Sequence, residues 1–219
     1  MKVKIPHDWF GWPTADRHPN WAPINIPLHM SPDGLLGYIK VHKCASNTHT
    51  NWLINERGWG RAWSPGSRMH TLDNGPHRSP SPSSLLVLVR DPVDRWLSAV
   101  GTLGRFKYDP AVVATVQRYH DTHDDLFTKN MNQHFWPYTW FLDEWSRFAD
   151  RMDLVDIVNG WDWFESHGVA DVPKDRHTNK MEDKWKLRED LLTPDVESRI
   201  RRFHEHDYAL CLRHGLDYR

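Results

Sequence analysis

Three stretches of the chain show the pattern of apolar residues that is typical of buried β-strands. Residues 36–42 alternate apolar side chains with others and include β-branched residues, which predicts a strand that ends near His42. Residues 84–89 form a continuous apolar run, as expected for a strand buried on both faces of a parallel sheet. Residues 152–158 alternate again and predict a third strand.

Helical signals lie between and after these strands. Asp91 suits an N-cap and Pro92 suits the first helical position, so a helix is expected from there to Gly104. Thr193 begins a second run of helical spacing, which ends at Gly215. Shorter or less regular helices are expected at residues 50–57, 110–127 and 161–167. Because strands and helices alternate, the sequence predicts an α/β fold of three layers, with helices flanking a parallel sheet.

The domain organisation follows from where this pattern begins. Residues 1–35 are rich in Pro, Trp, His and Asn, and we expect an irregular N-terminal arm packed on the domain. Residues 36–219 then form a single α/β domain, a length that suits one hydrophobic core. Residues 58–83 are rich in Gly, Pro and Ser and predict a long loop.

Composition and charge exclude several classes of protein. The net charge of −1 gives no global argument for a nucleic-acid partner. No run approaches the ~20 apolar residues of a membrane span, and residues 1–6 lack an apolar signal core, so we expect a soluble, cytoplasmic protein. The only two cysteines, Cys44 and Cys211, lie far apart in the sequence and suggest no disulfide framework, which favours a reducing compartment.

A candidate anion site follows the first predicted strand. Lys43 opens a short polar loop that runs into the start of a helix, where backbone N–H groups and the helix dipole favour a bound anion. The GxxxxGK[ST] pattern of a P-loop is absent. A second candidate lies at the end of the second strand, where Arg90 is followed by Ser98 two helical turns later.

Together these two motifs resemble a known family. A strand ending in Lys-x-Ala-Ser-x-Thr, followed by a strand ending in Arg-Asp-Pro-x-x-Arg-x-x-Ser, resembles the sulfotransferases that use 3′-phosphoadenosine 5′-phosphosulfate (PAPS), most closely the carbohydrate-modifying branch. The resemblance implies a P-loop-NTPase-like sulfotransferase fold. It also implies transfer of a sulfuryl group from PAPS to an acceptor hydroxyl, with a glycan as the favoured acceptor, release of 3′,5′-ADP, and no metal.

The resemblance also assigns site residues. The first loop would hold the 5′-phosphosulfate through Lys43, Cys44, Ala45, Ser46, Asn47 and Thr48, although Asn47 stands where Ser or Thr is usual. Arg90 and Ser98 would hold the 3′-phosphate. A polar loop at residues 173–182 resembles the family's late loop over the nucleotide, with Arg176, Asn179 and Lys180 as candidate contacts.

The general base has several candidates. His70 and Asp73 lie where the family often places its base after the loop lysine, and a histidine suits proton abstraction near pH 7. His134 lies in a segment that resembles a family stretch of His, Pro and Gln, although Tyr138 stands where Gln is usual. Glu56 is a rival on the first helix. These four remain open.

Other functions also remain open. The chain resembles a family whose animal members are anchored in the Golgi, so a form without an anchor suggests a microbial or viral source. An ATP-dependent kinase with a degenerate P-loop would need Mg²⁺, which separates it from a sulfotransferase. A non-catalytic nucleotide- or glycan-binding protein is the other alternative, and the 13 Trp residues, most of which we interpret as packing, leave room for a sugar-stacking surface.

Overall fold

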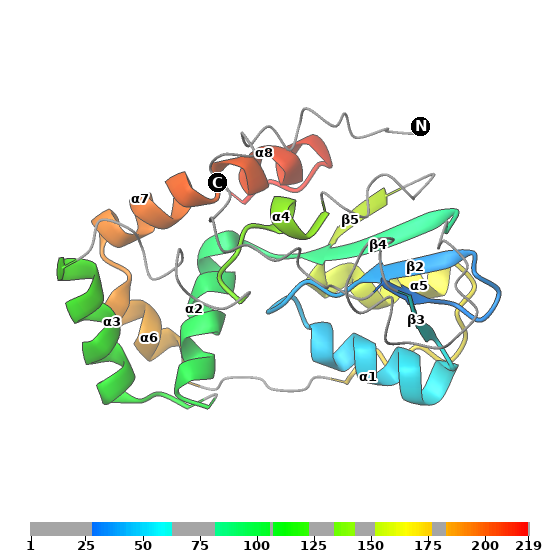
Figure 1. Ribbon diagram of the computed structural model, residues 1–219, viewed down its shortest axis with the longest axis horizontal. Helices are drawn as coiled ribbons and strands as arrows, with labels where there is room; N and C mark the ends of the chain where they lie inside the picture. The colour runs from blue at the N-terminus through cyan, green and yellow to red at the C-terminus, as the bar shows by residue number, and fades with distance from the viewer. Residues whose placement is uncertain are drawn as a thin grey trace.

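The computed structural model describes residues 28–62, 82–105, 107–122, 134–142, 152–176 and 183–218. A five-stranded sheet lies at one end of this part of the chain, with helices around it (Figure 1). The strands are β1 (Leu28–Met30), β2 (Leu36–Ile39), β3 (Gly60–Ala62), β4 (Ser84–Val89) and β5 (Met152–Asp156). The helices are α1 (Ser46–Arg57), α2 (Pro92–Leu103), α3 (Pro110–Thr122), α4 (Tyr138–Leu142), α5 (Gly160–Ser166), α6 (Lys184–Leu191), α7 (Pro194–Phe203) and α8 (Glu205–Arg213), with a 3₁₀ turn, η3, at Ile157–Asn159.

The sheet is mixed, and the expectation of a wholly parallel sheet is therefore wrong. The strand order is β3-β1-β2-β4-β5. The three strands predicted from the sequence, β2, β4 and β5, are parallel neighbours, with Tyr38 opposite Leu86 and Val87 opposite Leu154. The other two strands, β1 and β3, add an antiparallel edge. The α/β class is thus confirmed, and the antiparallel edge is the correction.

The antiparallel edge arises from a hairpin that the sequence analysis placed in the irregular arm. The turn between β1 and β2 is closed by the Ser31 N–H, which donates to the Leu36 carbonyl at 2.9 Å. The Asp33 carboxylate accepts from the Ser31 hydroxyl at 2.5 Å and from the Leu35 N–H at 2.9 Å. Gly34 adopts φ 75°, a conformation that suits glycine. The Ser-Pro-Asp-Gly sequence of this turn was the available signal.

Two hydrophobic cores meet where β4 runs into α2. The first core joins the sheet to α1 and α5, whose Trp52 and Trp161 rings pack edge to face at 5.2 Å. The helices α4 and α8 lie on the opposite side of the sheet from α1 (Figure 1). The second core joins α2, α3, α6 and α7 around Trp96 and Val116. The β4–α2 junction therefore lies between the two cores, and packing on both sides restricts the positions of its residues.

The C-terminal helix predicted over residues 193–215 is two helices. The break lies at His204, a buried residue whose Nδ1 is 2.8 Å from the Asp207 carboxylate. That carboxylate also accepts from the Tyr138 and Thr139 N–H groups at 2.8 and 3.0 Å, so it caps the start of α4. The helical spacing by itself favours one long helix, and the break coincides with the buried contact between Asp207 and the start of α4.

Candidate functional site

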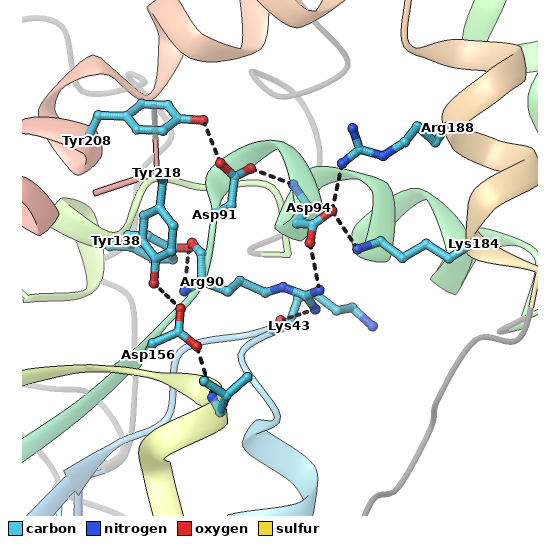
Figure 2. Close-up of polar contacts among 11 residues, drawn as sticks. Lys43, Arg90, Asp91, Asp94, Tyr138, Asp156, Lys184, Arg188, Tyr208 and Tyr218 are labelled. Carbon is cyan, nitrogen blue, oxygen red and sulfur yellow. Dashed lines mark hydrogen bonds and ion pairs between the residues drawn. The ribbon is translucent and has the colours of Figure 1, made fainter. Parts of the chain in front are cut away.

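The carboxyl ends of the parallel strands bring the two predicted motifs together. Lys43 follows β2 and Arg90 follows β4, and the Arg90 Nη1 donates to the Lys43 carbonyl oxygen at 3.3 Å (Figure 2). Ligands of α/β proteins bind at the carboxyl ends of the parallel strands. The sequence separation of the two residues is large, so this contact is a consequence of the fold.

The loop after β2 has an unusual backbone. Lys43 and Ala45 adopt φ values of 67° and 52°, in the left-handed region that non-glycine residues enter at a cost of about 1 kcal/mol or more. Ala45 is also the N-cap of α1, and it makes no side-chain capping hydrogen bond. The first turn of α1 carries no acidic residue either. The helix N-terminus therefore has a positive dipole end with no carboxylate in its own first turn, a combination that suits an anionic ligand.

Side chains of this loop divide into two groups. Cys44 and Thr48 are buried, and burial raises the pKa of the Cys44 thiol to about 11. Only the Cys44 backbone would therefore serve a ligand of the loop. Lys43 is partly exposed and Asn47 is exposed, so both lie at the surface of the loop.

Lys43 is an unusually weak base for a lysine. Burial, and then the positive charge of Arg90, lower its pKa to about 8. Figure 2 shows that the Lys43 side chain lies beside the Arg90 guanidinium. A bound anion would favour the charged form of Lys43.

The Asp94 carboxylate, on the first turn of α2, lies within ion-pair distance of three cationic side chains. Asp94 lies 3.5 Å from Arg90, 2.8 Å from Lys184 and 3.0 Å from Arg188, measured between side-chain nitrogen and oxygen atoms (Figure 2). Burial acts to raise the pKa of Asp94, but the bonds from Lys184 and Arg188 and the charge of Arg90 lower it overall. Lys184 and Arg188 come from α6, a helix that the sequence analysis did not predict.

Ser98, the second predicted contact for the 3′-phosphate, lies one turn beyond Asp94 on α2. Residues four apart share a helix face, so Asp94 and Ser98 lie on the same side of α2, and Asp94 contacts Arg90 just before the helix begins. Ser98 is half-buried, and its hydroxyl makes no hydrogen bond to any of the described residues. Its position is compatible with the predicted role.

Arg95 is a site residue that the sequence analysis did not single out. It is 1% exposed, donates from Nε to the His42 carbonyl oxygen at 2.9 Å, and lies over the Tyr138 ring at 4.8 Å. The Tyr138 hydroxyl in turn bonds to the backbone of Arg90. The Arg-Asp-Pro-x-x-Arg motif already contained Arg95, so its fixed place in the motif was the signal. Arg95 therefore links the end of β2, through the His42 carbonyl, to Tyr138, which bonds the backbone at the end of β4.

Two histidines lie beside Lys43. The rings of His42 and His134 meet edge to face, with centroids 4.7 Å apart. Burial, and then nearby positive charges including those of Lys43 and Arg95, lower the pKa of His42 to about 3 and that of His134 to about 4. Both rings are therefore neutral at pH 7. The structure thus places the predicted base His134 at the loop and adds His42, which the sequence analysis did not name.

Other predicted site residues lie elsewhere. Arg176 forms an ion pair with Glu56, near the C-terminal end of α1. Glu56 comes ten residues after Ser46, which corresponds to about 15 Å along the helix from its N-terminus. The structure therefore does not bring Arg176 or Glu56 to the Lys43 loop. The predicted residues His70, Asp73, Asn179 and Lys180 lie outside the described residues.

Comparison of the chain with protein-family models, curated proteins and solved structures finds no significant match. Within the described ranges, no group of three or more His, Cys, Asp and Glu side chains is arranged to hold a metal ion. No helix in that part of the chain is long and apolar enough to cross a membrane. The functional argument therefore depends on the site itself.

Proposed function

We propose that this protein is a PAPS-dependent sulfotransferase with the P-loop-like fold of that family, and that it transfers a sulfuryl group to a hydroxyl of a carbohydrate. The observation that carries the proposal is the contact between Arg90 and Lys43 at the carboxyl ends of β4 and β2. Two motifs that the family uses for the two ends of one nucleotide are adjacent here, although 47 residues separate them.

The described residues fit the two anionic ends of PAPS. The N-terminus of α1, where the N-cap Ala45 makes no side-chain capping bond, and the Lys43 side chain suit the 5′-phosphosulfate. Arg90 suits the 3′-phosphate through its guanidinium N–H groups, and Ser98 supplies a hydroxyl one helical turn beyond Asp94, the residue that Arg90 contacts. This arrangement would distinguish PAPS from ATP, which has no 3′-phosphate.

PAPS supplies a sulfuryl group attached to a phosphate that leaves as part of 3′,5′-ADP. In the transfer, the bond from the acceptor oxygen to sulfur forms as the bond from sulfur to the phosphate oxygen breaks. Lys43 would stabilise the negative charge that develops on the departing phosphate. As in phosphoryl transfer, the protein contributes mainly by positioning and by charge stabilisation.

His134 would accept the proton of the acceptor hydroxyl. It lies against His42, beside the Lys43 loop, and it is neutral at pH 7, as a base must be. A bound dianion would offset the nearby positive charges and raise the pKa of His134 from its value of about 4. His70 remains the other candidate base of the proposal.

A thermal-shift titration tests the proposal. The melting temperature is measured with 3′,5′-ADP, 5′-AMP and ATP in the absence of Mg²⁺, since a ligand that binds only the folded protein raises it. We expect 3′,5′-ADP to stabilise the wild type more than either other nucleotide, and Arg90→Ala to remove that effect. Arg202→Ala, on the exposed surface of α7, is the matched control.

Two results would contradict the proposal. An equal shift with 5′-AMP would mean that the site does not read a 3′-phosphate. A shift that appears only with ATP and Mg²⁺ would favour the kinase alternative. If 3′,5′-ADP binds selectively, incubation with ³⁵S-labelled PAPS and a set of glycans then tests turnover and the acceptor class.

A further inference from the structure

The cluster of Arg90, Asp94, Lys184 and Arg188, hereafter the Asp94 cluster, is not balanced in charge. Three cationic side chains share one carboxylate, which leaves an excess of two positive charges. Within the described residues, no other carboxylate lies at ion-pair distance from any of the three cations. Burial, and then the positive charge of Arg90, lower the pKa of Lys184, as expected where cations lie close together in a partly buried place.

The geometry leaves hydrogen-bond donors for a further anion. One Asp94 oxygen contacts Lys184 and Arg188, and the other contacts Arg90. Each guanidinium carries five N–H donors, and one carboxylate occupies only a part of them. The Arg90 Nε is buried and has no hydrogen-bond acceptor in the described structure. An anion with several oxygens would use donors that Asp94 alone leaves over.

We propose that Arg90, Lys184 and Arg188 form a binding site for a phosphate monoester dianion, with Asp94 as the internal anion that holds the three cations in place. A dianion matches the excess of two positive charges, and its three terminal oxygens match donors that come from the end of β4 (Arg90) and from α6 (Lys184 and Arg188) (Figure 2). Ser98, one turn along the same face of α2, borders the site.

The identity of the ligand deepens the proposed function and rests on it. If the protein binds PAPS, the phosphate at this site is the 3′-phosphate, because Arg90 belongs to the site. Lys184 and Arg188 are then nucleotide-binding residues in addition to Arg90 and Ser98. The anion site itself depends only on the Asp94 cluster, so it can be tested separately from the nucleotide.

The test compares two substitutions in the cluster with one beside it. Lys184→Gln and Arg188→Gln, and the double variant, each remove positive charge with little change in shape. Lys186→Gln is the matched control, because Lys186 lies on the same helix but pairs with Asp183 at 3.3 Å. Dissociation constants for 3′,5′-ADP, 5′-AMP and inorganic phosphate are measured by titration calorimetry, and circular dichroism verifies folding.

We expect the double variant to bind 3′,5′-ADP at least tenfold more weakly, since a hydrogen bond to a charged group contributes about 1.5–3 kcal/mol and 1.4 kcal/mol corresponds to a factor of about ten. Affinity for 5′-AMP is expected to stay within about twofold, because 5′-AMP places no phosphate at the cluster. Lys186→Gln should behave as the wild type.

The outcomes separate this inference from the proposed function. If the wild type prefers 3′,5′-ADP over 5′-AMP and the folded double variant keeps that preference, the inference is overturned and the proposed function stands. If the wild type shows no such preference, the proposed function fails. The inference is then tested by comparing the binding of inorganic phosphate to the wild type and to the double variant. Loss of phosphate binding in the double variant would then support the anion site, and unchanged binding, or none in the wild type, would overturn it.

Discussion

The Tyr138 hydroxyl bonds both polar groups of the Arg90 backbone, donating to its carbonyl oxygen and accepting from its N–H at 3.2 Å. The Tyr138 ring also lies under the Arg95 guanidinium. Tyr138 therefore fixes the backbone from which the Arg90 side chain extends. This relationship explains how α4 can position the motif that begins at Arg90.

Tyr138→Phe tests this positioning role. The substitution keeps the ring but leaves the partly buried Arg90 N–H without its acceptor, so we expect a loss of about 1–2 kcal/mol in the free energy of unfolding. Affinity for 3′,5′-ADP should fall severalfold. Urea unfolding and calorimetry measure the two effects. Tyr108→Phe, which removes an exposed hydroxyl bonded to Asp190, is the control; equal losses of nucleotide affinity in both variants would contradict a specific role for Tyr138.

Lys43 predicts proton uptake on ligand binding. Its pKa is about 8 in the ligand-free protein, and a bound anion raises it. At pH 8 about half of the molecules must therefore gain a proton at Lys43, and affinity for 3′,5′-ADP should fall as the pH rises above 8. Calorimetry in buffers of different ionisation enthalpy measures the uptake. Lys43→Met should abolish it; persistence of the full uptake in that variant would assign the proton to another group.

His29 predicts loss of stability in acid. Burial, and then the charges of Arg61 and Lys40, lower its pKa from 6.5 to about 4 in the folded protein. The unfolded chain therefore binds more protons between pH 6.5 and pH 4, and the stability falls as the pH falls through that window.

His29→Phe removes this penalty, because neither ring nitrogen of His29 has a hydrogen-bond partner in the described structure. We expect the variant to lose about 1–3 kcal/mol less than the wild type between pH 7 and pH 4. Urea unfolding at both values measures the difference. The buried His42 and His134 act in the same direction, so part of the pH dependence should remain. Identical pH dependence in both proteins would show that His29 does not titrate in this range.

The sequence predicts the parallel half of the sheet well, for physical reasons. The apolar run of β4 and the alternation in β2 and β5 reflect burial, which local composition records. The helix α2 carries its own start signals in Asp91 and Pro92, and the structure shows the Asp91 side chain capping it. The two candidate motifs directly follow β2 and β4. The pattern therefore also predicts that the motifs lie together at the carboxyl ends of the parallel strands.

What the sequence does not predict depends on contacts between distant segments. The strands β1 and β3 have three residues each, too few for a period to be recognised. The break between α7 and α8 at His204 lies beside Asp207, whose carboxylate accepts from the Tyr138 N–H, 69 positions earlier in the chain. Lys184 and Arg188 reach the Asp94 cluster only because α6 packs on α2 through Leu187 and its neighbours. None of these pairings leaves a local signal.

Asp94→Asn distinguishes an internal anion from a simple structural link. The substitution preserves the shape of the side chain but removes its charge, so the excess positive charge of the Asp94 cluster rises from two to three. We therefore expect 3′,5′-ADP, or inorganic phosphate if the nucleotide does not bind, to bind about three- to tenfold more tightly. The free energy of unfolding should fall by about 1 kcal/mol, since partly exposed ion pairs and a favourable charge near a helix N-terminus are lost.

The matched control for this variant is Asp195→Asn. Asp195 also lies in the first turn of a helix, and it also pairs with an arginine four positions away, at 3.7 Å from Arg199, whereas the arginine at that spacing from Asp94 is Arg90, on its N-terminal side. It shares the helix-dipole and ion-pair effects of Asp94 but is not part of the Asp94 cluster, so its loss should leave ligand affinity unchanged. Weaker binding by Asp94→Asn, with Asp195→Asn unaffected, would mean that the Asp94 charge is needed to orient the cations and does not compete with the ligand for them.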